Sequence, residues 1–336
     1  MSFGVVRGFM YMLLSTFFFA VAGPVAKALY GIGWTPGSVV LIRLSGASLL
    51  LLIPTLLALR GRWGEVRSHW KTILLYGVVS MAGVQAFFFL ALEHLSVAVA
   101  ILLEMMGAPL IIVFWLWART KQRPNLITAI GVIVSLIGVV LVLDFRNASL
   151  SWVGIVMALA AAACFASYFL VSADDTIRLP SIAFTGLGMG IGAVAALIAN
   201  LAHLMPARFV TTDLDFAGLR VSWLVPALLL IVFTVGAYLF GILGLRHLGA
   251  TVGSYVNLTE VPFSAIAAWV LLAEILTPLQ LAGGIVILTG IVLVKWGDIE
   301  AARHQLRPRD KAMIDSRQDH DPQKPTQSSR ASEGHV

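Results

Sequence analysis

Long apolar runs, separated by short polar connections, make up most of this chain. Each run is about 18 to 24 residues long, and a helix needs roughly 20 apolar residues to cross a hydrocarbon layer about 30 Å thick. The pattern therefore predicts ten membrane-spanning helices. Their expected bounds are 8–29, 37–59, 72–92, 96–117, 126–143, 152–172, 181–204, 222–245, 250–273 and 279–296.

The same pattern occurs twice along the chain. Residues 87–117 and 240–270 align without a gap at an offset of 153. Each copy contains five helices, and an odd number of spans turns the second copy upside down in the membrane. The sequence therefore predicts an all-α integral membrane protein of two inverted five-helix repeats, 8–143 and 152–296. Identical pairs in the alignment include Phe87 and Phe240, His94 and His247, and Pro109 and Pro262.

Composition supports a membrane location. Of the 336 residues, 59% are hydrophobic and 12% are charged, and the mean hydropathy of +0.92 lies outside the range of soluble globular domains. The net charge of +6 does not indicate a nucleic-acid partner, because 8 of the 23 Lys and Arg residues lie from Lys295 onward and most others flank apolar runs. The single cysteine, Cys164, excludes a disulfide framework.

Basic residues in the connections set the expected orientation. The connections after the second and fourth runs are basic, whereas the one after the first carries no charge and the one after the third carries Glu93 alone. Because basic connections stay on the cytoplasmic side, both termini are expected in the cytoplasm. The basic residues are Arg60, Arg62, Arg67, Lys71, Arg119, Lys121 and Arg123.

Matched positions of the repeat agree with an inverted second copy. At the offset of 153, Glu93 becomes Arg246 and Lys121 becomes Glu274, so the sign of the charge changes with the expected side of the membrane. Residues 297–336 hold few large apolar side chains and are expected to form a disordered cytoplasmic tail. In the first run, Ala20-Val21-Ala22 resembles a signal-peptidase site, but cleavage there would break the five-plus-five match.

Glu104 and Glu260 are the strongest candidates for a functional site. They lie eight and ten residues into their runs, roughly 12–15 Å deep, and an ionisable side chain near the middle of a bilayer is costly to keep. The repeat aligns Glu104 with Asn257 and Glu260 with Gly107, so matching polar faces are expected at a cavity between the repeats. The predicted site also includes Lys27, Tyr255, Thr259 and Tyr168.

Each of these features also has a purely structural interpretation. The two carboxyls would then be protonated or hydrogen-bonded only to hold helices together, and Lys27 and Arg43, in the outer third of the membrane, would extend to the headgroups. Overlapping G-x-x-x-G spacings in 186–192 indicate close helix packing rather than a phosphate loop. No H-E-x-x-H, G-x-S-x-G or Walker A pattern is present, so the sequence predicts neither an enzyme nor a metal or cofactor site.

From residue 8 to residue 296 the chain resembles the drug/metabolite transporter superfamily, specifically proteins with two EamA-type domains. The resemblance implies ten helices as inverted repeats and movement of small organic solutes by alternating access. Two positions depart from the family: Lys121 replaces a usual acidic residue, and Phe19-Ala20 replaces a common Trp-Gly near the transport path, so substrate identity does not transfer. The positions that carry the resemblance are Lys27, Arg43, Pro109, Pro262, Gly131, Gly284 and Leu271-Leu272-Ala273-Glu274.

The expected function is that of a secondary transporter in the inner (plasma) membrane, moving a small amino-acid-like or drug-like solute. Glu104 and Glu260 would bind the polar head of the solute or take up a proton during the cycle. The expected partners are this small-molecule substrate and the lipid bilayer, with a homodimer left open. The alternative is a non-transporting membrane scaffold or lipid-interacting protein, and a membrane-embedded enzyme would need catalytic groups converging on one pocket.

Overall fold

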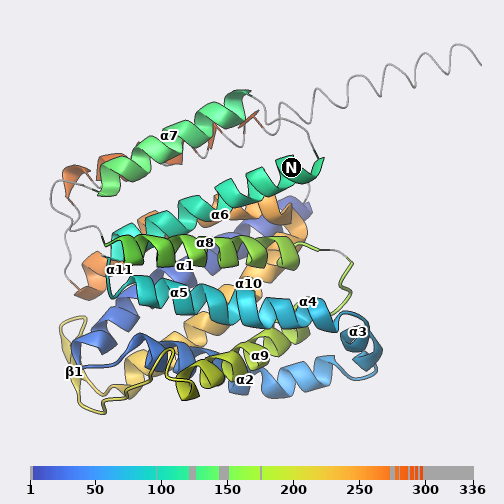
Figure 1. Ribbon diagram of the computed structural model, residues 1–336, viewed down its shortest axis with the longest axis vertical. Coiled ribbons are helices and arrows are strands. Elements are labelled where there is room, and N and C mark those ends of the chain that lie inside the picture. The colour runs from blue at the N-terminus through green and yellow to red at the C-terminus, as the bar shows by residue number, and fades with distance from the viewer. Residues whose placement is uncertain are drawn as a thin grey trace, which may run out of the picture.

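The computed structural model describes residues 3–95, 97–120, 126–143, 151–174 and 176–272, with short stretches between 277 and 297. Its helices lie side by side and form a bundle (Figure 1). The predicted charge pair Lys121 and Glu274, and the tail after residue 297, lie outside the described residues. The helices are α1 (Phe3–Gly31), α2 (Pro36–Ala58), α3 (Trp63–Ser68), α4 (Trp70–Leu75), α5 (Val84–Ala91), α6 (Val97–Thr120), α7 (Leu126–Leu143), α8 (Trp152–Ser172), α9 (Ser181–Leu201), α10 (Leu224–Asn257) and α11 (Glu260–Leu272).

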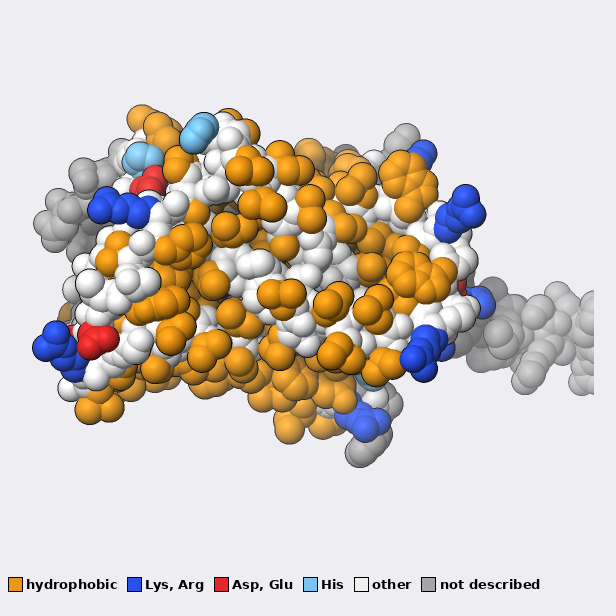
Figure 2. Space-filling view, turned by 90° about the horizontal axis from the view of Figure 1, so that it is seen from below, with side chains coloured by type: hydrophobic (Ala, Val, Ile, Leu, Met, Phe, Trp, Pro, Cys, Tyr) orange, Lys and Arg blue, Asp and Glu red, His pale blue; other side chains and the backbone are white. Residues whose placement is uncertain are grey.

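The outer surface of the bundle is apolar. Figure 2 shows hydrophobic side chains over the middle of one face and Lys and Arg side chains at its two ends, and Leu49 and Ile53 of α2 are 71% and 69% exposed. Soluble monomers rarely expose such continuous apolar surface, so the surface supports a helical membrane protein. Six helices within the described residues are long and apolar enough to span a membrane: Gly4–Gly31, Pro36–Ala58, Trp70–Ala91, Trp152–Ser172, Ser181–Leu201 and Leu224–Asn257.

Shorter apolar helices accompany these six. They are Val99–Ile112, Leu126–Gly138, Glu260–Leu271 and Leu281–Gly290. The span from Trp70 to Ala91 is not a uniform α-helix, because α4 continues through a π-helical segment, η1 (Tyr76–Gly83), into α5. Segments of π-helix are rare and often occur at functional sites. In η1, the hydroxyls of Ser80 and Ser167 of α8 form a hydrogen bond of 3.0 Å.

The eighth predicted span and the first part of the ninth form one element, α10, with a sharp bend between them. Gly249 at the bend has φ 76° and ψ 167°, a conformation that glycine adopts readily. A second interruption follows, because α10 ends at Asn257 and α11 begins at Glu260. Pro262 explains it: proline has no N–H to donate to the carbonyl of Leu258, which accepts instead from the amide of Val261 at 3.2 Å. Glu260 therefore lies at an interruption in a helix.

A small β-hairpin is an addition to the predicted helices. Strand β1 (Leu214–Phe216) pairs antiparallel with β2 (Leu219–Val221). The turn residues Ala217 and Gly218 both have positive φ, which is the geometry that a two-residue hairpin turn requires. The pattern of apolar runs does not predict this turn, because residues 205–221 lie between two of the runs.

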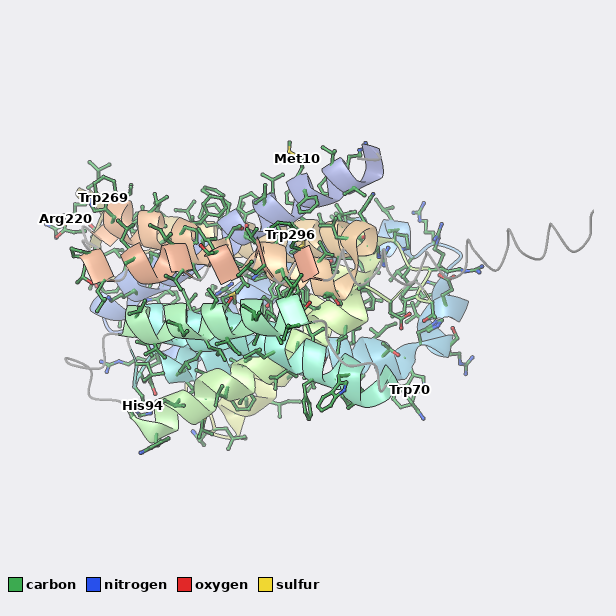
Figure 3. All side chains as sticks on the ribbon, turned by 90° about the horizontal axis from the view of Figure 1, so that it is seen from above. Met10, Trp70, His94, Arg220, Trp269 and Trp296 are labelled. Carbon is green, nitrogen blue, oxygen red and sulfur yellow. The ribbon has the colours of Figure 1, made fainter. Side chains whose placement is uncertain are left out.

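The hairpin marks one end of the bundle, and α3 marks the other. At the hairpin end, the indole Nε1 of Trp34 donates to the carbonyl of Val210 at 2.7 Å. At the α3 end, Nη1 of Arg62 donates to the carbonyl of Arg178 at 3.4 Å, which joins the connections before α3 and before α9. In Figure 3, the labelled side chains of His94, Arg220 and Trp269 lie at the hairpin end, and that of Trp70 lies at the α3 end.

Equivalent contacts occur in the two halves of the chain. Helix α1 packs against α10 and α11, and α8 packs against α5, η1 and α6. Gly8 of α1 is so close to α10 that a Cβ there would lie 2.7 Å from the Cβ of His247, and a Cβ on Gly154 of α8 would lie 2.8 Å from the Cβ of His94. These two histidines are a pair that the sequence repeat aligns, so the two helix packings correspond.

Candidate functional site

A small cavity with a few charged and polar side chains lies where the two halves of the bundle meet. Its volume of about 40 Å³ leaves room for a few water molecules. Phe19 of α1 and Phe165 of α8, which both line it, are in edge-to-face contact with ring centroids 5.9 Å apart. These residues are 146 apart in sequence, as are Gly8 and Gly154. The polar and aromatic lining consists of Phe19, Arg43, Gln85, Phe88, Phe89, Glu104, Phe165, Tyr238 and Glu260.

Arg43 supplies the positive charge of the cavity. Its side chain is 4% exposed, so the interpretation that it extends to the headgroups is wrong. The Nε of Arg43 donates to the hydroxyl of Thr234 on α10 at 2.8 Å, and that hydroxyl donates to the carbonyl of Leu230 at 2.6 Å. The guanidinium carbon also lies 5.2 Å from the ring centroid of Phe89, within the range of a cation–π interaction.

Glu104 and Glu260 supply two carboxyls to the same cavity. They are 5% and 6% exposed and come from α6 and α11, in different halves of the chain. Arg43 interacts electrostatically with both. The side-chain Nδ2 of Asn257 donates to Oε2 of Glu260 at 3.0 Å and approaches the sulfur of Met105 at 3.1 Å. The structure thus brings together three of the predicted site residues, Glu104, Asn257 and Glu260.

Gln85 of α5 and Tyr238 of α10 are cavity residues that the sequence analysis did not select. Both are buried and their polar groups face each other, although within the described part of the chain neither makes a hydrogen bond of standard geometry. Their positions differ by 153, the offset of the repeat, so they are equivalent positions of the two halves. That equivalence was a usable signal, since it places two polar side chains just before the aligned pair Phe87 and Phe240.

The other predicted site residues lie away from this cavity. Lys27 is exposed on the outside of α1. Thr259 lies between α11 and α1, where its hydroxyl donates to the hydroxyl of Thr16 at 3.2 Å. Tyr255 lines a separate, smaller pocket of mainly apolar residues. Tyr168 is fully buried directly behind Tyr238, with ring centroids 5.4 Å apart.

The glycine-rich stretch of α9 packs closely against its neighbours. A Cβ on Gly188 would lie 2.5 Å from the ring of Tyr76, and one on Gly192 would lie 3.1 Å from the Cβ of Met81. Gly186 faces the side chain of Thr55 on α2. These contacts support the interpretation of 186–192 as a packing surface and leave no room there for a phosphate.

A cavity lined by one buried guanidinium and two buried carboxyls is unusual in a membrane-embedded bundle. Ionisable side chains at such depth face the protein interior and mark pathways or binding sites for solutes and ions. The six long apolar helices and the apolar outer surface define the protein as a multi-pass helical membrane protein. The buried charged side chains of Arg43, Glu104 and Glu260 lie at the centre, where the two halves meet.

Comparison with known proteins identifies the family. The model of the EamA-like transporter family matches residues 6–144 and 152–296, and the chain belongs to this family. Over 292 residues it is 26% identical to a Bacillus subtilis (strain 168) protein named "Uncharacterized transporter YwfM", covering 85% of this chain and 92% of the relative. A solved structure titled "Crystal structure of protein" matches with a TM-score of 0.63 and 18% identity, over 87% of this chain and 96% of that one. This likeness shows a shared fold.

Proposed function

We propose that the protein is a secondary transporter that moves a small organic solute across the cytoplasmic membrane by alternating access. The observation that carries this proposal is the cavity that joins Arg43, Glu104 and Glu260 between the two halves. Transporters built of inverted repeats bind their substrates at such an interface. The cavity is too small for an organic solute in this conformation, so the proposal requires the halves to move apart before a solute enters.

The charges of the cavity favour an amino-acid-like solute. A guanidinium recognises a carboxylate through paired hydrogen bonds, and the carboxyls of Glu104 and Glu260 match an ammonium group. Phe19, Phe89 and Phe165 offer aromatic surface for an apolar side chain. A solute with both charges would neutralise groups that are otherwise costly to bury, and a proton taken up by one carboxyl would serve the same purpose between transport steps.

The proposal includes ten spans arranged as two inverted repeats, with both termini in the cytoplasm. The correspondence between the Gly8–His247 and Gly154–His94 contacts supports this arrangement. The α3 end would then be cytoplasmic, because the basic connection that contains Arg62 and Arg67 lies there. No enzymatic step enters the proposal, since the cavity residues bind and carry charge without converging on a reacting group.

The test is solute flux in proteoliposomes with Glu104→Gln, Glu260→Gln and the double variant. Glutamine keeps the size of the side chain and removes its ability to ionise. Each single variant is expected to lower flux at least tenfold, and the double variant is expected to lose the dependence of flux on pH. The exposed Glu93 at the elbow before α6 provides the matched control, Glu93→Gln. Unchanged flux and unchanged pH dependence in all the cavity variants would refute the role of both carboxyls.

A scaffold that does not transport is the alternative. In that case the carboxyls would serve packing, and the glutamine variants would lower the unfolding temperature while cell metabolites stayed unchanged. A comparison of metabolites between cells that lack the protein and cells that overproduce it distinguishes the two. Accumulation of one solute class in one of the two strains supports transport.

A further inference from the structure

A chain of buried hydroxyls runs from the cavity toward the α3 end. Tyr238 lines the cavity, the ring of Tyr168 lies 5.4 Å from it, and the ring of Tyr76 lies 6.2 Å from Tyr168. The three rings are fully buried. Ser172, the last residue of α8, adjoins Tyr76, and the connection that follows α8 lies at the α3 end, where Arg178 contacts Arg62.

These hydroxyls are incompletely satisfied in this conformation, where that of Tyr76 faces Ser172 and that of Tyr238 faces Gln85. Among the described residues, Tyr76, Tyr168, Ser172 and Tyr238 make no hydrogen bond of standard geometry through their side-chain oxygens, and Thr185 in the first turns of α9 shares this property. Most buried polar groups in proteins are paired, and leaving one unpaired is unfavourable. Several such groups in one region therefore point to partners that are present in another conformation.

The repeat provides an internal comparison. At the offset of 146 that relates α8 to α1, Tyr168 corresponds to Ala22 and Ser172 corresponds to Ala26. At the offset of 153, Tyr76 corresponds to Leu229. The equivalent positions toward the hairpin end therefore carry no polar side-chain atom. Packing that both halves share cannot require these hydroxyls, because the other half is built without them.

Tyr30 has a buried hydroxyl of the same kind in the half toward the hairpin end. Its ring, however, contacts Phe89, with centroids 6.5 Å apart, and its hydroxyl interacts electrostatically with Arg43. It therefore belongs to the surroundings of the cavity and does not extend a second chain of hydroxyls toward the hairpin.

We propose that Tyr76, Tyr168 and Ser172 form a polar subsite on the route between the central cavity and the α3 end. The subsite binds uncharged hydrogen-bonding groups, either of a passing solute or of water, when the bundle opens at that end. The route toward the hairpin end has an apolar lining at the equivalent positions, so the two routes differ in chemistry although the halves correspond in fold. This inference rests on the proposed transport function.

Thiol labelling tests the subsite without a known substrate. In a Cys164→Ala background, Ser172→Cys is exposed to the membrane-impermeant reagent 2-(trimethylammonium)ethyl methanethiosulfonate from the α3 side. Ala26→Cys, its equivalent in the other half, is exposed from the hairpin side. We expect Ser172→Cys to react at least tenfold faster, because the polar route fills with water. Equal rates, or a faster reaction of Ala26→Cys, would overturn the proposal.

A second measurement separates the subsite from fraying of the end of α8. Tyr76→Phe and Tyr168→Phe together are expected to slow labelling of Ser172→Cys at least threefold, because the open route loses hydrogen-bonding partners. Tyr11→Phe, on the other side of α1 beside His247, is the control and should leave the rate unchanged. If the labelling rate of Ser172→Cys is the same with and without Tyr76→Phe and Tyr168→Phe, the end of α8 only frays and the subsite is refuted.

Stability completes the test. Since these hydroxyls make no hydrogen bond of standard geometry in this conformation, the two phenylalanine variants are expected to unfold at the temperature of the parent or above it. A lower unfolding temperature would reveal a structural hydrogen bond and count against the proposal. If the parent protein moves no solute while the labelling pattern is as expected, the proposed transport function is refuted and the proposed hydrated route is still supported.

Discussion

The hydrogen bond between Arg43 and Thr234 gives a sharp test of how the cavity is organised. Thr234→Val keeps the shape of the side chain and removes the hydroxyl that accepts from Nε of Arg43 at 2.8 Å. Both residues are buried, at 4% and 0% exposure, so water does not replace the lost partner. A hydrogen bond to a charged group contributes about 1.5–3 kcal/mol, and each 1.4 kcal/mol corresponds to about tenfold in an equilibrium constant.

We therefore expect Thr234→Val to lower the free energy of unfolding by about 1.5–3 kcal/mol. Thr234→Ser is the matched control, because it retains the hydroxyl and should recover most of the loss. The measurement is thermal unfolding of the purified protein in detergent, with solute flux as a second readout. If the valine variant unfolds at the temperature of the parent and transports normally, Thr234 does not position Arg43 and the account of the cavity's positive charge is incorrect.

Two further substitutions test the packing and the helix interruption. Gly188→Ala places a Cβ 2.5 Å from the ring of Tyr76 and should destabilise the protein by about 1–3 kcal/mol in thermal unfolding. Gly190→Ala is the control and should be tolerated, because its Cβ would lie 3.4 Å from its nearest neighbour. Equal effects of the two substitutions would contradict the packing role of α9. Pro262→Ala restores an N–H at the interruption before α11 and should raise the unfolding temperature while slowing solute flux. The same change at Pro109, inside the continuous helix α6, should alter flux less. Equal slowing of flux by the two substitutions would argue against a special role for the interruption.

Much of the helical framework followed from the pattern of apolar runs. The predicted runs 126–143 and 152–172 coincide with α7 and α8, and 37–59 differs from α2 by one residue at each end. Irregular backbone was not predictable in the same way. The π-helical segment η1 depends on packing between helices, and the bend at Gly249 depends on which side of the membrane the next helix must enter. The pattern of apolar runs therefore predicts neither the π-helical segment nor the bend.

The candidate site could be predicted only in part. Glu104, Asn257 and Glu260 stood out because charged and amide groups are rare in apolar runs. Arg43 was ambiguous, because distance along a helix does not reveal whether a long side chain turns toward the cavity or toward the headgroups. Tyr238 resembled the many aromatic residues around it, and its importance appears only when the fold places it beside the charged cavity. Arg43 and Tyr238 are identified as cavity residues by the burial of their side chains and by the direction in which these point, and not by residue type.

The cavity combines a symmetric framework with asymmetric chemistry. The two glutamates are not equivalent, since the repeat pairs Glu104 with Asn257 and Glu260 with Gly107. Each half therefore contributes one carboxyl, at a different position on corresponding helices, while the charge that faces both comes from Arg43 in one half alone. In the proposed transport cycle, corresponding helices would allow the two ends of the bundle to open by similar movements. Unequal side chains mean that a bound solute or proton meets different partners in each state, and a difference in binding energy between two states is what shifts their populations. In the proposed transport cycle, duplication of the fold would provide the movement, and divergence between the copies would set its direction.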